Sequence, residues 1–345
     1  MEHNALSAKA QEFLRIAFYT LPLKEEAVKF FSIFSVFIIA MNVLEKKRQF
    51  QRIVLVIIFW GLLLSFYGLF KKYTVLGAVE TQSFSTFGNA NHFAGYMIMV
   101  VPLAIGYGLS CRNIFVKLIF GFIAAMISAS IFLSLSRAGS FSLLLSLMVM
   151  CYLLFRQNAD MAKYGVIILV VAVSMLLLAV AGPGPLKKTF IFLKEGLLGR
   201  WAISRDSLAI TRDFPLCGCG LGNFSYIFPI YQTFATFPVY YKYLHNEYLQ
   251  MIVEIGLIGA LFYFFFIFKI LKDIFGQITK RHDPFVQNIV LGGWCGLIGV
   301  LFHSIFEFNF HIPAVTFLFW LIMGLSYKCA YTRFLHPSSD NEEET

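Results

Sequence analysis

One histidine stands at the start of an apolar run, in the tripeptide His245-Asn246-Glu247. Asn246 is a good helix N-cap, so we expect His245 to lie just before the first turn of a helix. The unpaired N–H groups and the positive dipole end of such a helix favour a neutral imidazole and attract anions. A neutral histidine beside a bound phosphate can act as a general base. The alternative interpretation is a histidine that only anchors the helix at an interface.

The run that begins after His245 carries three polar residues, Glu247, Gln250 and Glu254, and their spacing places them on one helix face. Glu254 lies one or two turns inside the apolar run, where a charge is costly and usually faces a cavity. We therefore predict that Asn246, Glu247 and Glu254 form a supporting polar group for His245.

Several arginines are candidates for binding an anion. Arg137, in Ser136-Arg137-Ala138-Gly139, lies at the junction of two apolar runs. A bound anion would explain that position, and a side chain that snorkels to the interface is the alternative. Arg200, Arg205 and Arg212 lie in an amphipathic stretch that also contains Trp201.

Further polar groups have simpler interpretations. His303 and Glu307 are four residues apart, with His311 beyond them, which allows a metal pair. No clear third or fourth ligand is present, so we predict a hydrogen-bonded polar pair and no metal site. The segment Gly88-Asn89-Ala90-Asn91-His92 is typical of a capped helix start, with Asn91 as a further supporting residue.

Two features lie between Pro215 and Tyr243. The glycine-rich turn 218–223 is not a dinucleotide fingerprint, because no βαβ pattern surrounds it, and it indicates a close backbone approach to another element. The aromatic tract 226–243 is typical of an interfacial belt at the level of the lipid headgroups. The alternative is a stacking surface for sugars or a lipid chain.

The elements that must position these residues are transmembrane helices. Hydrophobic residues make up 59% of the 345 positions and charged residues only 14%, whereas a soluble domain carries about a quarter charged residues. A bilayer core needs about 20 apolar residues in a helix. The sequence therefore predicts an all-α, polytopic bundle of about nine spans. The runs are 27–44, 53–70, 93–110, 115–135, 139–155, 164–182, 248–270, 287–305 and 312–330.

One long segment, 183–247, separates the sixth and seventh runs, and we expect it to contain short helices. Lys and Arg residues concentrate in alternate loops, which places this segment on the periplasmic side and the C-terminus in the cytoplasm. The net charge of +9 follows this loop pattern and does not indicate a nucleic-acid partner. The predicted layout is an outer N-terminal segment 1–26, helices one to six in 27–182, the periplasmic loop 183–247, helices seven to nine in 248–331, and a cytoplasmic tail 332–345.

These motifs, in this order, resemble the O-antigen ligase family, which also includes O-antigen polymerases and protein O-oligosaccharyltransferases. No single motif is specific to this family, but the ordered set of motifs on this topology is. The similarity spans about residues 27–330. It rests on 88–95, Ser136 to Gly139, Gly199-Arg200-Trp201, the turn 215–224, the segment 245–250, Glu254, Gly256, Gly259, His303-Ser304 and Pro313.

The resemblance implies roles for individual residues. The family's proposed catalytic motif has ten residues between a histidine and a glycine, as His245 and Gly256 do here. Arg137 and Arg200 would bind the pyrophosphate of a polyprenyl-linked glycan, and Arg205 is a further candidate. The leucine that often follows the family's arginine motif is replaced by Phe141. Members usually carry further upstream spans, so the resemblance implies a chain that is short at its N-terminus.

The implied function is an inner-membrane glycosyltransferase that needs no cofactor. We expect a metal-independent, inverting transfer from a polyprenyl pyrophosphate carrier to an acceptor hydroxyl, with lipid A–core as the acceptor in O-antigen ligation. An O-antigen polymerase is the alternative within the family. A transporter or flippase of lipid-linked glycans is the alternative of another class, but such proteins often show paired repeats, and none is evident here.

Overall fold

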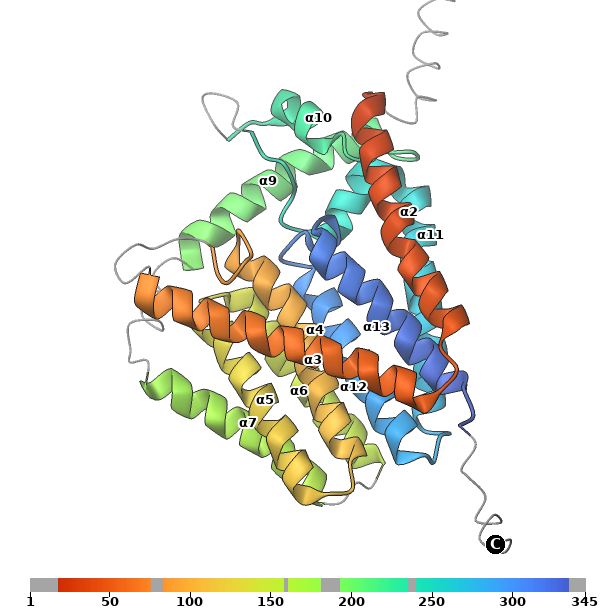
Figure 1. The fold of residues 1–345 in the computed structure, drawn as a ribbon. Coiled ribbons are helices and arrows are strands. Elements are labelled where there is room, and N and C mark those ends of the chain that lie inside the picture. Colours follow the sequence, from red (N-terminus) through yellow and green to blue (C-terminus); the bar gives the residue numbers. More distant parts are fainter. Residues whose placement is uncertain (1–17, 76–82, 158–160, 181–192, 235–239, 335–345) are drawn as a thin grey trace, which may run out of the picture.

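The computed structural model describes residues 18–75, 83–157, 161–180, 193–234 and 240–334. Over these residues the chain is helical, and its only β contact is an isolated bridge between Phe84 and Phe87. The helices pack into one bundle with a smaller group of helices above one end (Figure 1). The prediction of an all-α bundle is confirmed.

Eight helices in the described part of the chain are long and apolar enough to cross a membrane. The helix at the sixth predicted run, α7 (Met161–Val180), has a described apolar part, Lys163–Leu176, that falls short of this length. Each of the nine predicted runs thus lies on a helix, and eight meet the criteria for a span. The eight are α2 (Thr20–Val43), α3 (Lys47–Phe70), α4 (Ala90–Ser110), α5 (Ile114–Leu133), α6 (Arg137–Arg156), α11 (Glu247–Ile278), α12 (Pro284–His303) and α13 (Pro313–Tyr331).

The helix ends differ from the ends of the apolar runs. Residues 20–26, predicted as part of an outer segment, form the first turns of α2. At the other extreme, α11 continues to Ile278, beyond the apolar run that ends at 270. Lys269 and Asp273 lie one turn apart there, 3.5 Å from each other. Charged turns of a helix interrupt the apolar pattern without ending the helix, so apolar runs underestimate helix length.

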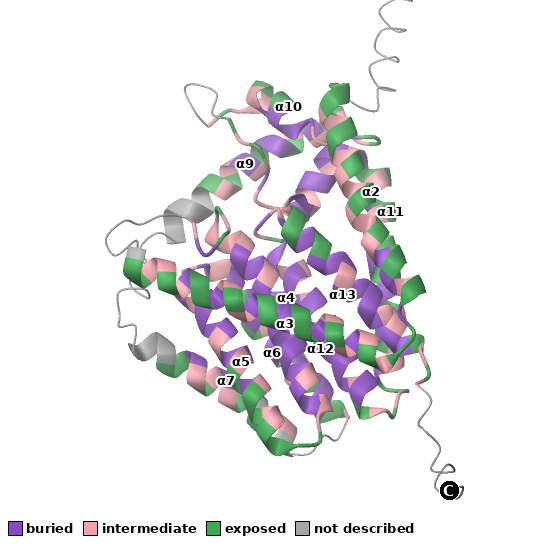
Figure 2. Cartoon of the chain, viewed as in Figure 1, coloured by how far each residue is buried: buried purple, intermediate pink, exposed green. Residues whose placement is uncertain are grey.

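The centre of the bundle is formed by α4 and α12, whose residues are mostly buried, whereas α2 and α3 expose apolar side chains (Figure 2). Glycines allow the two central helices to touch: a Cβ on Gly292 would lie 2.4 Å from the carbonyl oxygen of Pro102. Small residues at such contacts are typical of membrane helix packing. The close contact fixes the start of α4 beside the end of α12.

The helix α11 is broken at Gly256, where φ is 71° and ψ is 177°. The segment 215–223, which contains the glycine-rich turn 218–223, packs into this break. The sequence predicted that this turn makes a close backbone approach to another element. Backbone N–H donors and carbonyl acceptors pair across the contact: Cys219 with Val253, Gly220 with Glu254, and Leu257 with Pro215, each at 2.9 Å. The break therefore serves to dock a loop segment, and it lies nine residues into α11.

Replacing Gly256 with alanine should destabilise the protein by about 1–3 kcal/mol, because a Cβ is strained at this positive φ. The Cβ would also lie 2.1 Å from the carbonyl oxygen of Leu216. The measurement is thermal unfolding of the purified protein in detergent. Gly276→Ala is the matched control on the same helix, since no atom lies within 4 Å of its added Cβ. Equal unfolding temperatures for the two variants would contradict this account of the break.

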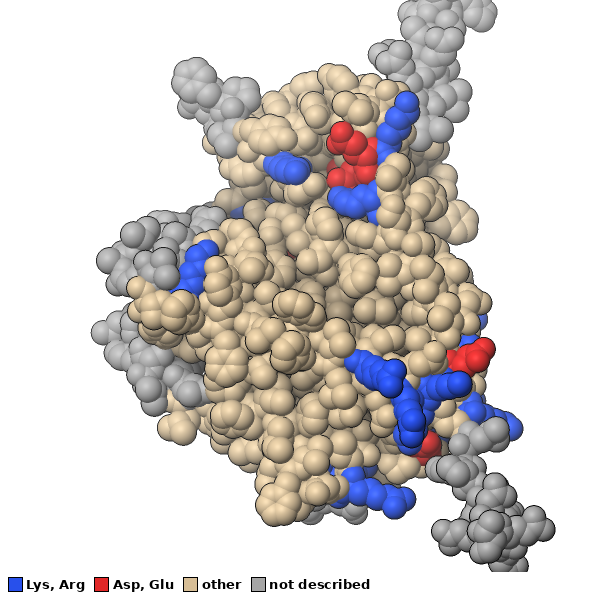
Figure 3. Space-filling view, in the orientation of Figure 1, with Lys and Arg blue, Asp and Glu red and all other residues tan. Residues whose placement is uncertain are grey.

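Basic loops gather at one end of the bundle. Lys47 lies 3.8 Å from Asp283, and the ring of Phe334 contacts both Phe50 and Phe285. The loops after α2 and α11 and the end of α13 therefore meet there. On the face seen in Figure 3, charged side chains gather towards the two ends, with a broad uncharged surface between them. This distribution suits a bundle that crosses a bilayer.

The described residues of the long segment before α11, 193–234 and 240–246, contain the helices α9 (Leu193–Asp213) and α10 (Phe224–Tyr231). α9 is longer than the short helices expected. The two helices share a small apolar core with the segment before α11, separate from the core of the bundle. Its buried members are Ile203, Ile210, Cys219, Phe224, Ile227, Phe228, Leu244 and Val253. This core holds α9 over the end of the bundle opposite the basic loops.

Candidate functional site

The polar residues with candidate roles meet at the end of the bundle under α9. Five pieces of chain contribute to this site: the starts of α4 and α6, the helix α9, the segment before α11, and the segment that links α12 to α13. These pieces are far apart in sequence. The fold therefore assembles the site from segments that the sequence pattern had treated separately.

Glu307 is the centre of the site. Its side chain is fully buried. One carboxylate oxygen, Oε1, accepts hydrogen bonds from Arg200 at 2.8 Å and from the Asn91 amide at 2.5 Å. The other oxygen, Oε2, lies 3.1 Å from Nδ1 of His245. A buried carboxylate with three polar partners thus joins the predicted base, a predicted arginine and a predicted supporting residue.

The Asn91 side chain extends this network to the start of α6. Its carbonyl oxygen accepts a hydrogen bond from the Ser136 hydroxyl at 2.7 Å. Ser136 in turn caps α6 by accepting from the backbone N–H of Gly139. Arg137 is the first residue of α6, and its charge interacts with that of Arg200. The structure therefore brings Arg137, Arg200 and His245 to one site.

The charges around Glu307 keep its carboxyl group ionised. Burial alone raises the pKa of Glu307, but the hydrogen bond to His245 and the positive charges around it lower that pKa below its ordinary value. The charge of Arg200 is among these. An ionised partner at Nδ1 favours the histidine tautomer with its proton on that nitrogen. The Nε2 atom of His245 is then left with a lone pair.

Helix caps at this site follow the sequence. Asn246 caps α11 by accepting from the backbone N–H of Leu249, as predicted. Asn89 caps α4 by accepting from the backbone N–H of Asn91. The predicted capped helix start at 88–92 is therefore confirmed, and the Asn91 side chain adds the contact with Glu307.

The prediction that His303 and Glu307 form a hydrogen-bonded pair is wrong. His303 pairs with Asn309, at 3.1 Å from its amide nitrogen, and Glu307 turns to His245 and Arg200. The chain leaves the α-helical path after His303, so the four-residue spacing no longer places the two side chains together. Among the described residues, no group of three or more His, Cys, Asp or Glu side chains is placed to hold a metal ion.

The contacts of Arg205 do not include Glu307. Its guanidinium donates to Asp206 at 2.9 Å and to the Thr233 hydroxyl at 2.6 Å. Asp206 also accepts from the backbone N–H of Thr233. These contacts tie α9 to the segment after α10, and a phosphate-binding role for Arg205 stays a prediction.

Glu247 and Glu254 form a second buried group with His311, which lies in the same linking segment as Glu307. The prediction that Glu247, Gln250 and Glu254 share a face is confirmed, and the Gln250 amide donates to Glu254 at 2.8 Å. Neither glutamate is among the hydrogen-bond partners of His245. Their supporting role is therefore indirect.

Sequence reasoning missed the central place of Glu307. The signal was present, since a lone carboxylate stands between Phe306 and Phe308 just beyond an apolar run. Charged residues in such surroundings usually have partners. It also gave no role to His92, whose ring lies against Phe308. Among the described residues, the buried Nε2 of His92 has no hydrogen-bond partner.

Comparison with known families gives a match over part of the chain. Residues 122–264 match the family model described as O-antigen ligase. The finding supports the O-antigen ligase family. The matched segment contains Arg137, Arg200 and His245, and Glu307 lies beyond it. No curated protein matches the chain.

The family match covers part of the chain, and together with the apolar helices it indicates the class of the protein. They support an O-antigen ligase- or polymerase-type membrane glycosyltransferase, with lipid-linked glycan substrates. They also support a multi-pass protein of the bacterial inner membrane.

Proposed function

We propose that this chain transfers a glycan from a polyprenyl pyrophosphate carrier to an acceptor hydroxyl, by an inverting displacement that needs no metal ion. The observation that carries the proposal is the contact of Glu307 with both His245 and Arg200. It places a candidate base and a candidate phosphate ligand on the two oxygens of one carboxylate. The site faces the periplasm in this proposal, because the basic loops lie at the opposite end.

His245 is the general base of the proposed reaction. Its Nδ1–H donates to Glu307, so Nε2 takes the proton of the acceptor hydroxyl as that oxygen attacks the donor sugar. Glu307 orients the imidazole and stabilises the imidazolium that forms. The His245 side chain is 28% exposed, so the ring is accessible from outside the bundle.

Arg200 and Arg137 bind the pyrophosphate in this proposal. Arg200 uses one of its amino groups on Glu307, and a guanidinium has five N–H donors in all. Its side chain is 31% exposed, which leaves part of it accessible to a ligand. Arg137 begins α6, and a helix start also attracts anions. Two fixed positive charges can neutralise the leaving pyrophosphate as its charge develops.

The bonds in the step follow from these roles. The acceptor oxygen bonds to the anomeric carbon of the donor sugar, and the bond from that carbon to the carrier phosphate oxygen breaks. The acceptor proton goes to Nε2 of His245, and the electron pair leaves on the pyrophosphate. Attack opposite the leaving group inverts the anomeric configuration.

Replacing Arg137 with alanine should raise the KM for the lipid-linked donor by about 10- to 100-fold, because a charge-assisted phosphate contact contributes about 1.5–3 kcal/mol. Arg137→Lys should recover only part of the loss, since lysine keeps the charge but loses the planar donor fork. Donor titrations with purified protein measure this effect. Arg156→Ala is the control, an exposed arginine at the opposite end of the same helix, α6. A donor KM unchanged by Arg137→Ala would remove this arginine from the site.

The acceptor in this proposal is lipid A–core, which makes the protein an O-antigen ligase. The test is the lipopolysaccharide gel pattern of a strain that lacks the gene. Core without O-antigen, with polymer accumulated on its lipid carrier, is the expected result. Core carrying a single repeat would instead identify a polymerase, and an unchanged pattern with no glycan defect would favour a transporter.

A further inference from the structure

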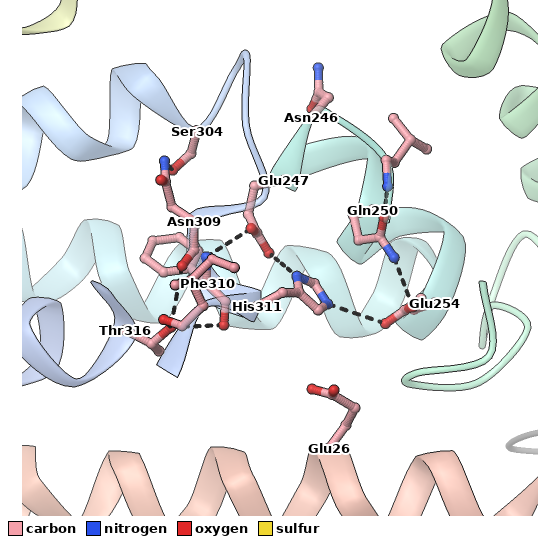
Figure 4. A network of polar contacts seen from close by, with 12 residues as sticks. Glu26, Asn246, Glu247, Gln250, Glu254, Ser304, Asn309, Phe310, His311 and Thr316 are labelled. Carbon is pink, nitrogen blue, oxygen red and sulfur yellow. Dashed lines mark hydrogen bonds and ion pairs between the residues drawn. The ribbon is translucent and has the colours of Figure 1, made fainter. Parts of the chain in front are cut away.

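A second group of buried charges lies beside the proposed site, in the Glu247–His311–Glu254 cluster. These three side chains are at most 5% exposed. His311 lies between the two carboxylates, with Nδ1 at 3.0 Å from Glu247 and Nε2 at 3.6 Å from Glu254 (Figure 4). Burial lowers the pKa of His311, but the two carboxylates outweigh it and raise that pKa to about 10. The imidazole is therefore charged, and the cluster carries one excess negative charge.

Such a cluster needs an explanation beyond stability. Replacing a buried ion pair or triad with well-packed apolar residues is often neutral or stabilising. Glu26 on α2 lies opposite the cluster (Figure 4), and Glu26 and Lys29 line a cavity of about 40 Å³ together with Glu247 and His311. They form an ion pair with each other, so they add no net charge. Tyr263 lines the same cavity. The ring of Tyr243 contacts that of His311, with centroids 4.6 Å apart.

The cluster contacts the two segments that carry the proposed base, His245, and its partner, Glu307. Glu247 accepts a hydrogen bond at 2.9 Å from the backbone N–H of Phe310, three residues beyond Glu307. The backbone N–H of Glu247 donates to the carbonyl of Ser304, three residues before Glu307. The segment that carries Glu307 is thus fixed on both sides by one residue of the cluster.

Further contacts of the cluster lead to His245 itself. Glu254 is bonded to Gln250, whose carbonyl oxygen accepts from the backbone N–H of Leu244 at 2.6 Å. Leu244 directly precedes His245. The ring of Phe308 lies between Tyr243 and His245, with centroid distances of 4.9 and 5.2 Å.

We propose that Glu247, His311 and Glu254 are positioning residues, which hold His245 and Glu307 in the geometry for proton transfer through the contacts of both segments. This proposal rests on the function proposed above. Among the described contacts, the cluster makes no hydrogen bond to the proposed base, so in this proposal it acts on kcat through geometry. The charge balance of the cluster sets that geometry, because removing the imidazolium leaves two buried carboxylates close together.

The test uses the full-length protein with His311→Gln and the charge-balanced double variant His311→Gln/Glu254→Gln. The single variant should lower kcat per folded protein by about 10- to 100-fold, with the donor KM unchanged, as for residues that orient a catalytic group. The double variant should recover kcat to within about threefold of wild type, because the net charge of the cluster returns to its original value. Folded protein is quantified by size-exclusion chromatography.

Controls separate positioning from stability and from the proposed function. Ser146→Ala removes a buried hydrogen bond to the carbonyl of Cys295 in the bundle core, and it should lower stability without changing kcat per folded protein. Wild-type kcat in His311→Gln, or a double variant no better than the single one, would overturn the positioning role. If His245→Ala also kept full activity, the proposed function itself would fail.

Discussion

Replacing His245 with alanine should lower kcat for glycan transfer by about a hundred- to ten-thousand-fold, the range that general-base catalysis contributes. Nε2 of His245 is the atom proposed to take the acceptor proton, and alanine leaves no group in its place. Donor binding should change little, because Arg137 and Arg200 remain. Transfer rates with purified protein at saturating donor measure the effect.

A second histidine provides the matched control. His282 is exposed in the loop between α11 and α12, at the far end of α11 from His245. His282→Ala should keep wild-type activity. Both variants should insert into the membrane and elute as folded protein, since the His245 ring is partly exposed and makes one hydrogen bond with the described residues. Wild-type turnover in His245→Ala would remove this histidine from the mechanism.

Replacing Glu307 with glutamine should have an effect of similar size, a loss in kcat of about a hundred- to ten-thousand-fold. The amide keeps the shape of the carboxyl group and can still accept from Asn91 and Arg200 through its oxygen. Its NH2 group would then face Nδ1 of His245 and donate to it. That contact favours the tautomer with the proton on Nε2, which leaves no lone pair for the acceptor proton.

A double-mutant cycle distinguishes this role from a separate contribution of Glu307. If the carboxylate acts through the imidazole, His245→Ala/Glu307→Gln should be no slower than His245→Ala alone. Glu45→Gln, at an exposed position between α2 and α3, is the control for the loss of a carboxylate. If the two single losses in kcat instead multiply in the double variant, Glu307 does not act through His245.

Much of the fold follows from the sequence because apolar length and charge breaks are local properties. The nine apolar runs fall on helices, and Asn246 caps the helix that the sequence assigned to it. Helix ends were less predictable, since the charged first turns of α2 and the last turns of α11 lie outside the apolar pattern. The sixth apolar run, 164–182, is long enough in the sequence for a span, although the described apolar part of α7 is shorter.

The site was predictable in its parts but not in its assembly. Residue types and spacing indicated His245, Arg137 and Arg200. The structure joins His245 and Arg200 through Glu307, and Arg137 follows Ser136, which bonds to Asn91 of the same network. The position of Glu307 depends on where the chain turns after α12 and on the close packing of α4 with α12. Those are tertiary contacts, and no spacing within one segment reports them.

The measurement that tests the central claim most directly is reconstitution of the purified protein with a polyprenyl-pyrophosphate-linked glycan and lipid A–core, in the presence of a metal chelator. The account predicts that each glycan joined to the acceptor releases one free polyprenyl pyrophosphate, and that the new bond has the inverted anomeric configuration. Retention of configuration, loss of transfer with the chelator, or movement of intact donor across the membrane without transfer would contradict it.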